Sequence, residues 1–479
     1  MPSSSISRVI VVGGGLAGLS AAHTLLERGK SVLLLDKKPS LGGNSVKASS
    51  GINGAGTSAQ RALDIQDSVE AFSADTTTSA GPDLARPALI TALTANSASA
   101  IAWLANQETF NVDLSVVSRL GGHNAARTHR DKSGAPGWAI TSALMKRLNV
   151  LAEGEGGENG KEKEKEKRVE IVKGAKVVKL LEEGGAVVGV EYETEGNTIT
   201  AKGDAVILAT GGYAADFTPT GILATHRPDL LPLSTTNGDH ATGDALRLTA
   251  PLRVSAGTTD LTQIQVHPTG FVDPANPAAK TKFLAAEALR GAGGMLLDGR
   301  GRRFVREVER RDVVTGKMQE VEGEGRGPVR LVLGERAVGE VKKHCDFYVS
   351  KKLMKAYPNA AAFAQDTGIP LENILETFAG YGGENDPFGA SNTPQTSYTP
   401  DEALHVAIIT PVVHYTMGGL SVDASARVLT SGDEAKPIPG LWAAGEVIGG
   451  VHGRNRLAGS SLLEAVVFGR IAGEGAAGN

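Results

Sequence analysis

The stretch VIVVGGGLAGLSAAHTLL, residues 9–26, decides the fold because it contains a strand, a tight turn and a helix in immediate succession. β-Branched residues run into a glycine triplet, and a helical pattern of Ala and Leu follows it. Gly13 permits the sharp turn, Gly15 lets a pyrophosphate approach the backbone, and Gly18 lets the helix pack closely on the strand. The spacing therefore predicts phosphates bound at the amides of a helix N-terminus.

A second predicted strand, residues 31–35, ends in Asp36. An acid at this distance from the glycine turn binds the ribose hydroxyls of an adenosine. A lone GxGxxG also occurs in ordinary glycine-rich loops, so it is the combination with Asp36 that predicts a nucleotide-binding α/β domain.

The bulk composition limits the kinds of partner. The 479 residues have room for about two to four domains, and 49 basic against 53 acidic residues leave a net charge of −4. No global field therefore attracts nucleic acid or an anionic membrane. The single cysteine, Cys345, excludes an intramolecular disulfide and suits a reducing compartment, and we interpret it as an apolar filler rather than a catalytic thiol. We expect a soluble protein without a membrane span or secretion signal, cytoplasmic by default, with organellar targeting left open.

The segments after Asp36 alternate between loops and helices. Residues 41–57, LGGNSVKASSGINGAGT, follow neither a helical nor a strand period and form a predicted long loop, whose small residues suit contact with a planar ligand. Helical spacing predicts helices within residues 67–110 and over 138–151. The alternating Lys and Glu of residues 153–170 indicate a disordered or solvated insertion.

Strand patterns follow this insertion and return near the C-terminus. Residues 169–178, 186–193 and 197–202 are predicted as an antiparallel meander, and the apolar stretch 205–209 as a strand buried on both faces. That strand ends in Thr210, Gly211 and Gly212, which puts bare backbone at the carboxyl edge of the sheet. A later strand, 441–444, ends in Gly445 and Glu446, and Ser460 and Ser461 are predicted to cap a helix whose positive end suits an anionic ligand such as a reduced flavin.

The composition changes between about residues 261 and 413, where charged and proline-containing loops alternate with short helical pieces. We predict a second domain inserted into the first, with boundaries at 1–261, 262–415 and 416–479. The basic cluster RGRRFVREVERR, residues 300–311, suggests a nucleic-acid partner, but its interleaved acids and the scarcity of aromatic residues argue against one.

Several charged or imidazole residues of this region lie in small, apolar contexts. His267 occurs in QVHPTG and His414 in VVHYTMGG, while Glu287 and Arg290 are three apart and share a helix face. Taken singly, each has a structural interpretation, since a Glu and Arg so spaced form ordinary ion pairs and a lone His commonly binds the backbone. Further candidates are Arg311, Asp312, Arg454 and Arg456.

These motifs occur in a specific order: GGNSVKASSGING, ATGGY, QVHPTG, AEALRG, VREVERRD, HYTMGG, AAGEVIGGVHGRNRLAG and SLLEA. In that order the chain, from residue 9 to about 469, resembles the soluble fumarate reductases of the flavoprotein family that also contains the succinate dehydrogenase flavin subunit, and especially the fungal single-chain enzymes without a haem domain. The resemblance implies a doubly wound, Rossmann-like α/β domain that binds FAD. It also implies an inserted α+β clamp domain that closes over a dicarboxylate on the isoalloxazine ring.

The resemblance also implies residue roles. Arg311 would be the proton donor, Glu287 and Arg290 the relay that reprotonates it, and His267, His414 and Arg456 the ligands of the two carboxylates. The implied FAD contacts are Gly13, Gly15, Gly18, Asp36, Lys37, Asn44, Ser45, Ser49, Ser50, Gly51, Thr210, Gly211, Asp244, Tyr415, Glu446, Ser461 and Leu462. No metal is implied.

Two departures from the family pattern matter. Ala286 stands where some relatives have a Thr before the relay Glu, so one carboxylate loses a hydroxyl contact. The loop GGNSVKASS contains no His, although complex-bound members link their flavin to a His there. We therefore predict FAD that is not covalently bound.

The predicted reaction is the reduction of fumarate to succinate. Hydride transfer from flavin N5 to one alkene carbon leaves negative charge beside the other, and cations at both carboxylates stabilise that charge most in the transition state. An arginine side chain has an ordinary pKa above about 12, but a strongly basic carbanion can take its proton when the acid is in contact and is resupplied.

Two alternatives remain open from the sequence. One is a related FAD enzyme, such as an L-aspartate oxidase or a reductase of another unsaturated acid, and the other is a flavoprotein that only shuttles electrons. The sequence leaves the electron donor and the oligomeric state undetermined. With one nucleotide fingerprint in the chain, we expect reduced flavin or another diffusible donor.

Overall fold

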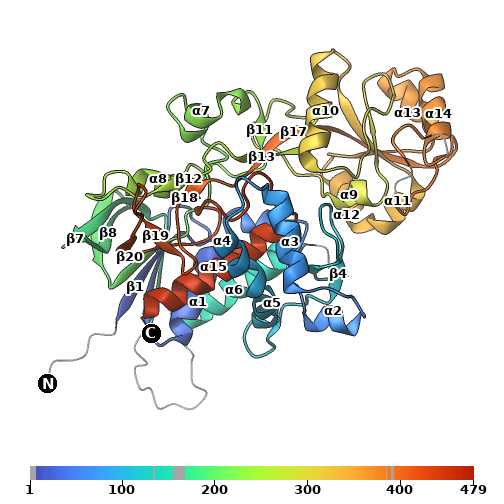
Figure 1. Cartoon of the computed structure of the whole chain (residues 1–479). Coiled ribbons are helices and arrows are strands. Elements are labelled where there is room, and N and C mark those ends of the chain that lie inside the picture. The colour runs from blue at the N-terminus through green and yellow to red at the C-terminus, as the bar shows by residue number, and fades with distance from the viewer. Residues whose placement is uncertain (1–6, 133–134, 155–167, 384–385, 390–392, 479) are drawn as a thin grey trace. The chain divides into compact units, whose positions relative to one another are not determined.

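The computed structural model describes residues 7–132, 135–154, 168–383, 386–389 and 393–478 (Figure 1). Contacts divide the chain into two compact units. The first contains Met1–Pro228, Gly238–Ile264 and Tyr415–Asn479, and the second contains Asp229–Asn237 and Gln265–His414. Most of the predicted Lys/Glu insertion, residues 155–167, lies outside the described residues, whereas Glu153 ends a helix and Val169 begins a strand.

A six-stranded sheet forms the centre of the first unit. Its strand order is β19 (Arg427–Leu429), β20 (Pro437–Ala443), β10 (Ala205–Leu208), β1 (Arg8–Val12), β2 (Ser31–Asp36), β6 (Val169–Lys173). Four pairings in it are parallel, and the edge strand β19 is antiparallel to β20. Strands β1 and β10 are apolar and buried almost throughout, as expected of strands covered on both faces.

Two helices from opposite ends of the chain pack side by side on this sheet, α1 (Leu16–Glu27) and α15 (Ser460–Ala477) (Figure 1). Glycines make the close approach possible, since a Cβ at Gly469 would lie 2.5 Å from the carbonyl oxygen of Ala17 and one at Gly473 2.9 Å from that of Ala21. Because α1 and α15 pack together, the glycine turn before α1 and the C-terminal segment belong to the same unit.

The predicted helical region 67–110 contains the helices α3 (Val69–Ala80), α4 (Pro87–Ala95) and α5 (Ser97–Ala105), and the predicted helix at 138–151 is α6 (Pro136–Glu153). Among the described residues, the stretch Pro87–Ala105 is long and apolar enough by composition to cross a membrane, which is weak evidence because core helices meet the same criteria. Leu89, Leu93 and Ile101 of this stretch are buried in the core of the first unit.

The prediction of a meander beginning at residue 169 is wrong in part. The three antiparallel strands are β7 (Lys176–Glu183), β8 (Ala186–Thr194) and β9 (Asn197–Lys202), whereas β6 pairs in parallel with β2 of the central sheet. The chain changes direction at Gly174, with φ +68°, and the Ala175 amide donates to the Asp36 carbonyl at 2.8 Å. Alternation of side chains alone does not distinguish these two pairings.

The first unit also contains short elements around its loops. They are η1 (Ser45–Lys47), β3 (Ile52–Asn53), α2 (Ser58–Ala62), β4 (Val116–Ser118), β5 (Thr128–Arg130), α7 (Ile222–His226), α8 (Asp244–Thr249), β12 (Thr258–Thr259) and β18 (Gly419–Leu420).

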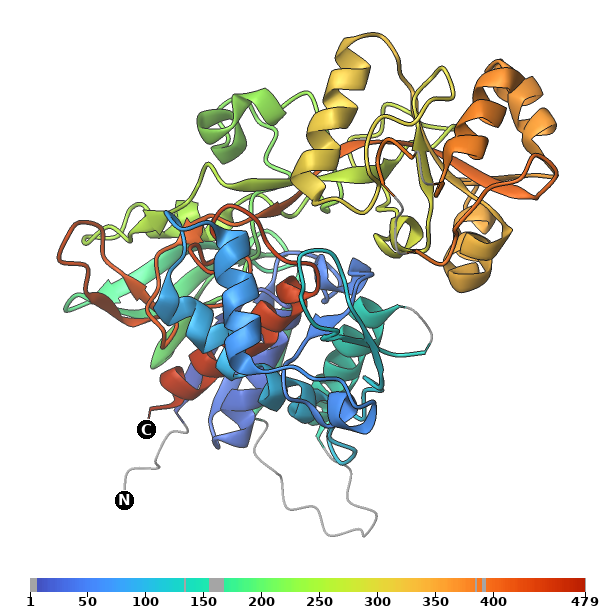
Figure 2. The same ribbon diagram turned by 45° about the vertical axis from the view of Figure 1, so that its right-hand side comes forward.

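The second unit is an α+β arrangement around a mixed sheet. In it β17 (Leu404–Thr416) pairs with β11 (Ser234–Thr235), β13 (Ile264–Phe271), β15 (Val329–Leu333) and β16 (Lys355–Tyr357), and β15 pairs with β14 (Met295–Leu297). Its helices are α9 (Ala288–Gly291), α10 (Arg311–Gly323), α11 (Glu335–Glu340), α12 (Lys342–Ser350), α13 (Ala360–Thr367) and α14 (Leu371–Gly380). Helices α13 and α14, drawn in orange, lie side by side (Figure 2).

Candidate functional site

The glycine turn of the first unit needs its three glycines for three different reasons. Gly13 has φ +108°, and a Cβ there would lie 2.3 Å from the Ala209 carbonyl oxygen. A Cβ at Gly18 would lie 1.8 Å from the Gly13 carbonyl oxygen, so α1 could not pack at this depth. At Gly15 the nearest atom to a Cβ is Ser45 Oγ at 4.0 Å, which leaves the backbone open to a ligand.

Residues from distant parts of the sequence meet at the carboxyl end of β2. Asp36 accepts hydrogen bonds from the amides of Gly14 and Lys38, both at 2.8 Å. Next to it, Lys37 Nζ forms an ion pair with Asp244 Oδ2 at 2.7 Å, so two predicted cofactor residues are in direct contact. This edge of the sheet is where open α/β folds bind their ligands.

The loop 41–57 lies against the glycine turn. Ser45 Oγ accepts from the Leu16 amide at 3.3 Å, and Asn44 Oδ1 accepts from the Gly238 amide at 2.9 Å. Within the described part of the chain, Ser49 Oγ and Thr210 Oγ1 are buried without a hydrogen-bond partner. A buried hydroxyl without a partner needs an explanation, and both of these belong to the predicted cofactor residues.

The remaining predicted cofactor residues lie in the same unit. Gly51 has φ +120° and Gly211 φ +74°, Ser50 is half-buried, and Leu462 is buried in the first turn of α15. The expectation that Ser460 and Ser461 cap this helix is wrong, because Gly459 is the N-cap, with φ +82° and no side-chain cap. Ser460 Oγ instead accepts from Asn53 Nδ2 at 2.9 Å, and its side chain is buried.

A buried polar cluster follows β17 in the first unit. Tyr415 donates to Glu464 Oε2, which also lies 3.3 Å from His452 Nε2. The Arg456 guanidinium lies over the Tyr415 ring, 4.6 Å from its centroid. Glu446 Oε1 accepts from the Thr416 amide at 3.0 Å and from its hydroxyl at 3.1 Å. Burial, together with the nearby charge of Glu464, raises the pKa of Glu446 to about 7.

This shift predicts that Glu446→Gln removes a pH dependence of stability. The unfolded carboxyl has a pKa near 4.5 and the folded one about 7, so the folded state binds more protons between these values and loses stability as the pH rises. At 1.36 kcal/mol per unit, the loss is about 3 kcal/mol. Thermal unfolding should give equal midpoints for wild type and Glu446→Gln near pH 4, below the unfolded pKa, and a higher midpoint for the variant at pH 8. A difference that does not change with pH would contradict the shift.

The second unit brings its own predicted residues together. Arg311, the first residue of α10, donates through Nε to Glu287 Oε2 at 2.9 Å, through Nη2 to the same oxygen, and through Nη1 to Gln265 Oε1 at 3.1 Å. The Arg311 side chain is 8% exposed and that of Glu287 15% exposed. A charge-assisted pair in so little water is geometrically fixed and strongly coupled.

Arg290 lies in α9 next to this pair and is fully buried. Its Nη1 donates to the carbonyl oxygens of Glu307 and, at 3.4 Å, of Glu309. In the described part of the structure its Nε and Nη2 have no hydrogen-bond partner. Burial lowers the pKa of Arg290, the charge of Glu287 raises it, and the charge of Arg311 lowers it. The three side chains therefore act on one another electrostatically.

A buried ion network holds the carbonyl that Arg290 binds. The Arg303 guanidinium forms two hydrogen bonds to Glu307, at 2.9 and 2.7 Å, and two to Asp386, at 2.8 and 2.7 Å. It lies between the rings of Tyr381 and Phe388, at 4.8 and 5.0 Å. With both carboxylates and both rings in contact, this arginine fixes the turn that contains Glu307.

His267 on β13 and His414 on β17 face each other, with ring centroids 5.2 Å apart. His267 is fully buried, and its Nδ1 accepts from the Thr269 amide at 3.2 Å. The neutral ring therefore has its proton on Nε2, which makes that atom a donor. His414 Nδ1 lies 2.8 Å from Thr236 Oγ1, and this hydrogen bond sets the orientation of the second ring.

The structure thus places Arg311, Glu287, Arg290, His267 and His414 in the second unit and Arg456 in the first. Gln265 was not predicted, although it is two residues before His267 on one strand, and residues so spaced face the same side. Glu464 was not predicted either, although an acid inside the apolar run LLEAVV is an indication of a buried polar role.

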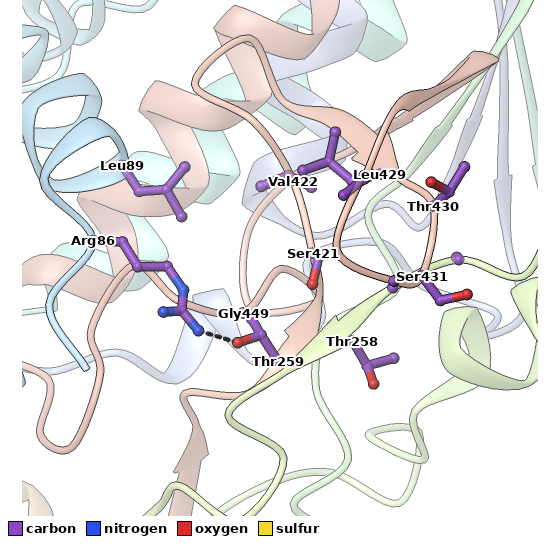
Figure 3. A pocket seen from close by; sticks show the side chains of 14 residues that line it. Arg86, Leu89, Thr258, Thr259, Ser421, Val422, Leu429, Thr430, Ser431 and Gly449 are labelled. Atoms are coloured by element: carbon purple, nitrogen blue, oxygen red, sulfur yellow. Dashed lines mark hydrogen bonds between the residues drawn. The ribbon is translucent and has the colours of Figure 1, made fainter. Parts of the chain in front are cut away.

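A cavity of about 490 Å³ occurs elsewhere in the first unit (Figure 3). It is lined by Arg86, Leu89, Thr258, Thr259, Ser421, Thr430 and other residues, none of which is a predicted site residue. The Arg86 guanidinium is paired with Asp260 at 3.1 Å, so its charge is already compensated. No group of three His, Cys, Asp or Glu side chains suited to a metal ion occurs within the described ranges.

Comparison with known proteins gives matches along the whole chain. The FAD binding domain family matches residues 8–462. A fumarate reductase of Schizosaccharomyces pombe is 42% identical, covering 99% of this chain and 90% of that protein, and fumarate reductase 1 of Saccharomyces cerevisiae is 41% identical, covering 98% of each. The solved open conformation of a flavocytochrome c3 fumarate reductase has a TM-score of 0.78 at 30% identity, covering 99% of this chain and 79% of that one.

Proposed function

The chain belongs to the FAD binding domain family, with fumarate reductases as relatives over almost its full length, and from that premise we propose how its residues reduce fumarate to succinate. The enzyme is an FAD-dependent oxidoreductase with a Rossmann-like domain and a capping domain. The contact of Arg311 with Glu287 and Gln265 is the observation on which the mechanism depends.

The residues of the first unit fit FAD. The open backbone at Gly15 and the two unpartnered hydroxyls of Ser49 and Thr210 offer donors to a dinucleotide, and Asp36 offers acceptors. FAD held by these residues would, when reduced, supply the two electrons of the reaction as a hydride. The loop 41–57 contains no histidine for a covalent link, which supports non-covalent binding.

Arg311 donates the proton to the substrate carbon that becomes basic when the other alkene carbon is reduced. Its charge stabilises the developing carbanion, and Glu287 holds two of its nitrogens so that the third faces a defined direction. After donation, the Glu287 carboxylate takes a proton from Arg290, with which it interacts electrostatically, and passes it to neutral Arg311, and solvent then reprotonates Arg290. An acid held in contact and resupplied in this way does not need a low pKa.

The two substrate carboxylates require fixed cationic or N–H donors. We assign His267 Nε2–H and His414 to one set of contacts and Arg456, held over the Tyr415 ring, to another. Ala286 has no hydroxyl, and its amide donates to Tyr348 Oη at 3.2 Å. One carboxylate therefore has one contact fewer than in relatives with a Thr at this position.

Electron supply and location are further parts of the proposal. The chain contains one strand–GxGxxG–helix fingerprint, which FAD uses, and this favours a diffusible donor such as reduced flavin over a second bound nucleotide. The single cysteine supports a reducing compartment, and we infer the cytoplasm.

The function is tested by anaerobic reoxidation of the dithionite-reduced holoenzyme with a panel of unsaturated acids, and by aerobic incubation with L-aspartate. We expect fumarate to reoxidise the enzyme fastest and to give one succinate per FAD. Faster reoxidation by another acid, or oxidation of aspartate under oxygen, would support a related substrate instead. Absence of reoxidation by every acid would support an electron-shuttling protein.

Gln265→Ala is expected to lower kcat about tenfold and leave FAD bound, because it removes the acceptor of Arg311 Nη1, a hydrogen bond to a charged group. Gln265→Asn, which keeps the amide on a shorter side chain, should lower it less. Gln263→Ala, two residues earlier on the chain, is the matched control and should match wild type. Unchanged kcat in Gln265→Ala would mean that the Gln265 contact does not orient Arg311.

A further inference from the structure

His240 lies in the loop between β11 and α8, beside the residues assigned to FAD. The Gly238 amide at the start of this loop donates to Asn44 Oδ1, which ties the loop to the glycine-rich segment 41–57. A Cβ at Gly238 would lie 2.4 Å from His240 Cε1 and 2.6 Å from its Nδ1, so the imidazole lies close to the backbone of this glycine.

The Nε2 atom of His240 is buried and has no hydrogen-bond partner in the described part of the chain. Its position is next to the dinucleotide turn, because a Cβ at Gly43 would be 4.0 Å from Nε2 and 3.6 Å from the Gly15 Cα. The other ring nitrogen, Nδ1, lies 3.9 Å from exposed Asp239, beyond hydrogen-bond distance. A buried imidazole nitrogen left unpaired carries a desolvation cost that a ligand can offset.

The charges around the ring favour an anionic ligand. Burial lowers the pKa of His240, and the nearby charges of Lys47 and Lys37 lower it further, whereas the charges of Asp239 and Asp36 raise it. Burial also lowers the pKa of Lys47. Two lysines held close to an imidazole repel its protonated form, and a diphosphate between them would relieve that repulsion.

We propose that His240 is an FAD ligand whose Nε2 binds the diphosphate–ribose half of the cofactor, beside the Gly13–Gly18 turn. This inference rests on the chain binding FAD and adds a residue from a loop outside the glycine motif.

The test measures FAD release from the diluted holoenzyme by the return of flavin fluorescence, with ADP as competitor. We expect His240→Ala to raise the Kd for FAD about tenfold and the inhibition constant of ADP by the same factor. His240→Gln, whose amide also offers an N–H, should recover most of the loss. The control His226→Ala, on α7 in the same unit, should match wild type.

Two results would overturn the proposal: a Kd for FAD within twofold of wild type in His240→Ala, or a weaker FAD affinity with an unchanged ADP constant. If His240→Ala does not fold, ¹⁵N NMR spectra of the histidine side chains of the wild-type protein test the contact instead. The His240 resonance is assigned as the one missing from the spectrum of His240→Gln. FAD should then shift the His240 Nε2 resonance, and an unshifted resonance would refute the contact. These measurements contain no fumarate, so their outcome tests the His240 contact and leaves the proposed fumarate reductase activity to its own experiment.

Discussion

Arg311→Ala is expected to abolish fumarate reduction, with kcat lowered at least a thousandfold, while FAD remains bound. The substitution removes a proton donor, which contributes about 10²–10⁴-fold in other enzymes, and a charge that stabilises the carbanion. The Arg311 side chain hydrogen-bonds Glu287 and Gln265 of the second unit, whereas the predicted FAD residues all lie in the first unit. Steady-state turnover and the flavin absorbance of the purified variant measure the two effects.

The neighbouring residue provides a matched control. Arg310 has a 62% exposed side chain that pairs with Asp312 at the surface, so Arg310→Ala removes the same group without disturbing the cluster. Its kcat should stay within twofold of wild type. Substantial turnover by Arg311→Ala, within tenfold of wild type, would refute the assignment of the acid.

Glu287→Gln is expected to lower kcat about a hundredfold. Glutamine keeps the size of the side chain and an oxygen that Arg311 can donate to, but it has no charge and cannot pass a proton. Because donation in a first turnover does not need a resupplied acid, a single reoxidation of the reduced variant should slow less than steady-state turnover. Stopped-flow and steady-state rates with fumarate separate the two steps.

Glu309→Gln is the control for this variant, since its exposed carboxylate pairs, among the described residues, only with Arg306, at 3.7 Å, and the substitution leaves in place the backbone carbonyl that Arg290 contacts. Equal steady-state rates for Glu287→Gln and wild type would remove the relay from the mechanism. Equal slowing of the single and multiple turnovers would instead assign Glu287 to positioning Arg311 rather than to resupplying it.

The local parts of the fold could be predicted from the sequence. The stretch 9–26 specifies its own strand, turn and helix, because Gly13 and Gly18 each have a steric reason that depends on a near neighbour or on one adjacent strand. The apolar strand 205–209 could be predicted in the same way, and it is β10, paired with β1.

Long-range pairing could not be predicted in this way. The side chains of β6 alternate like those of β7, and only the turn at Gly174 and the contact with β2 separate them. The ion pair between Lys37 and Asp244 joins residues 207 positions apart, a relation that spacing cannot reveal.

The residues of the candidate site likewise fall into those that sequence motifs predict and those that only contacts in the folded chain reveal. The motif order led to Arg311, Glu287 and His267, whereas Gln265 and His240 depend on neighbours that only the folded chain brings together. Gln265 shares a strand face with His267, so strand alternation was a usable indication. For His240 the indication is an unpaired buried nitrogen, which the sequence does not contain.

A crystal structure of the holoenzyme with succinate tests the central claim most directly. The account predicts that the diacid contacts the Arg311 guanidinium, with one nitrogen about 3–3.5 Å from a methylene carbon, and that its carboxylates are held by His267, His414 and Arg456. Succinate bound elsewhere, or an Arg311 guanidinium turned away from both methylene carbons, would contradict the account.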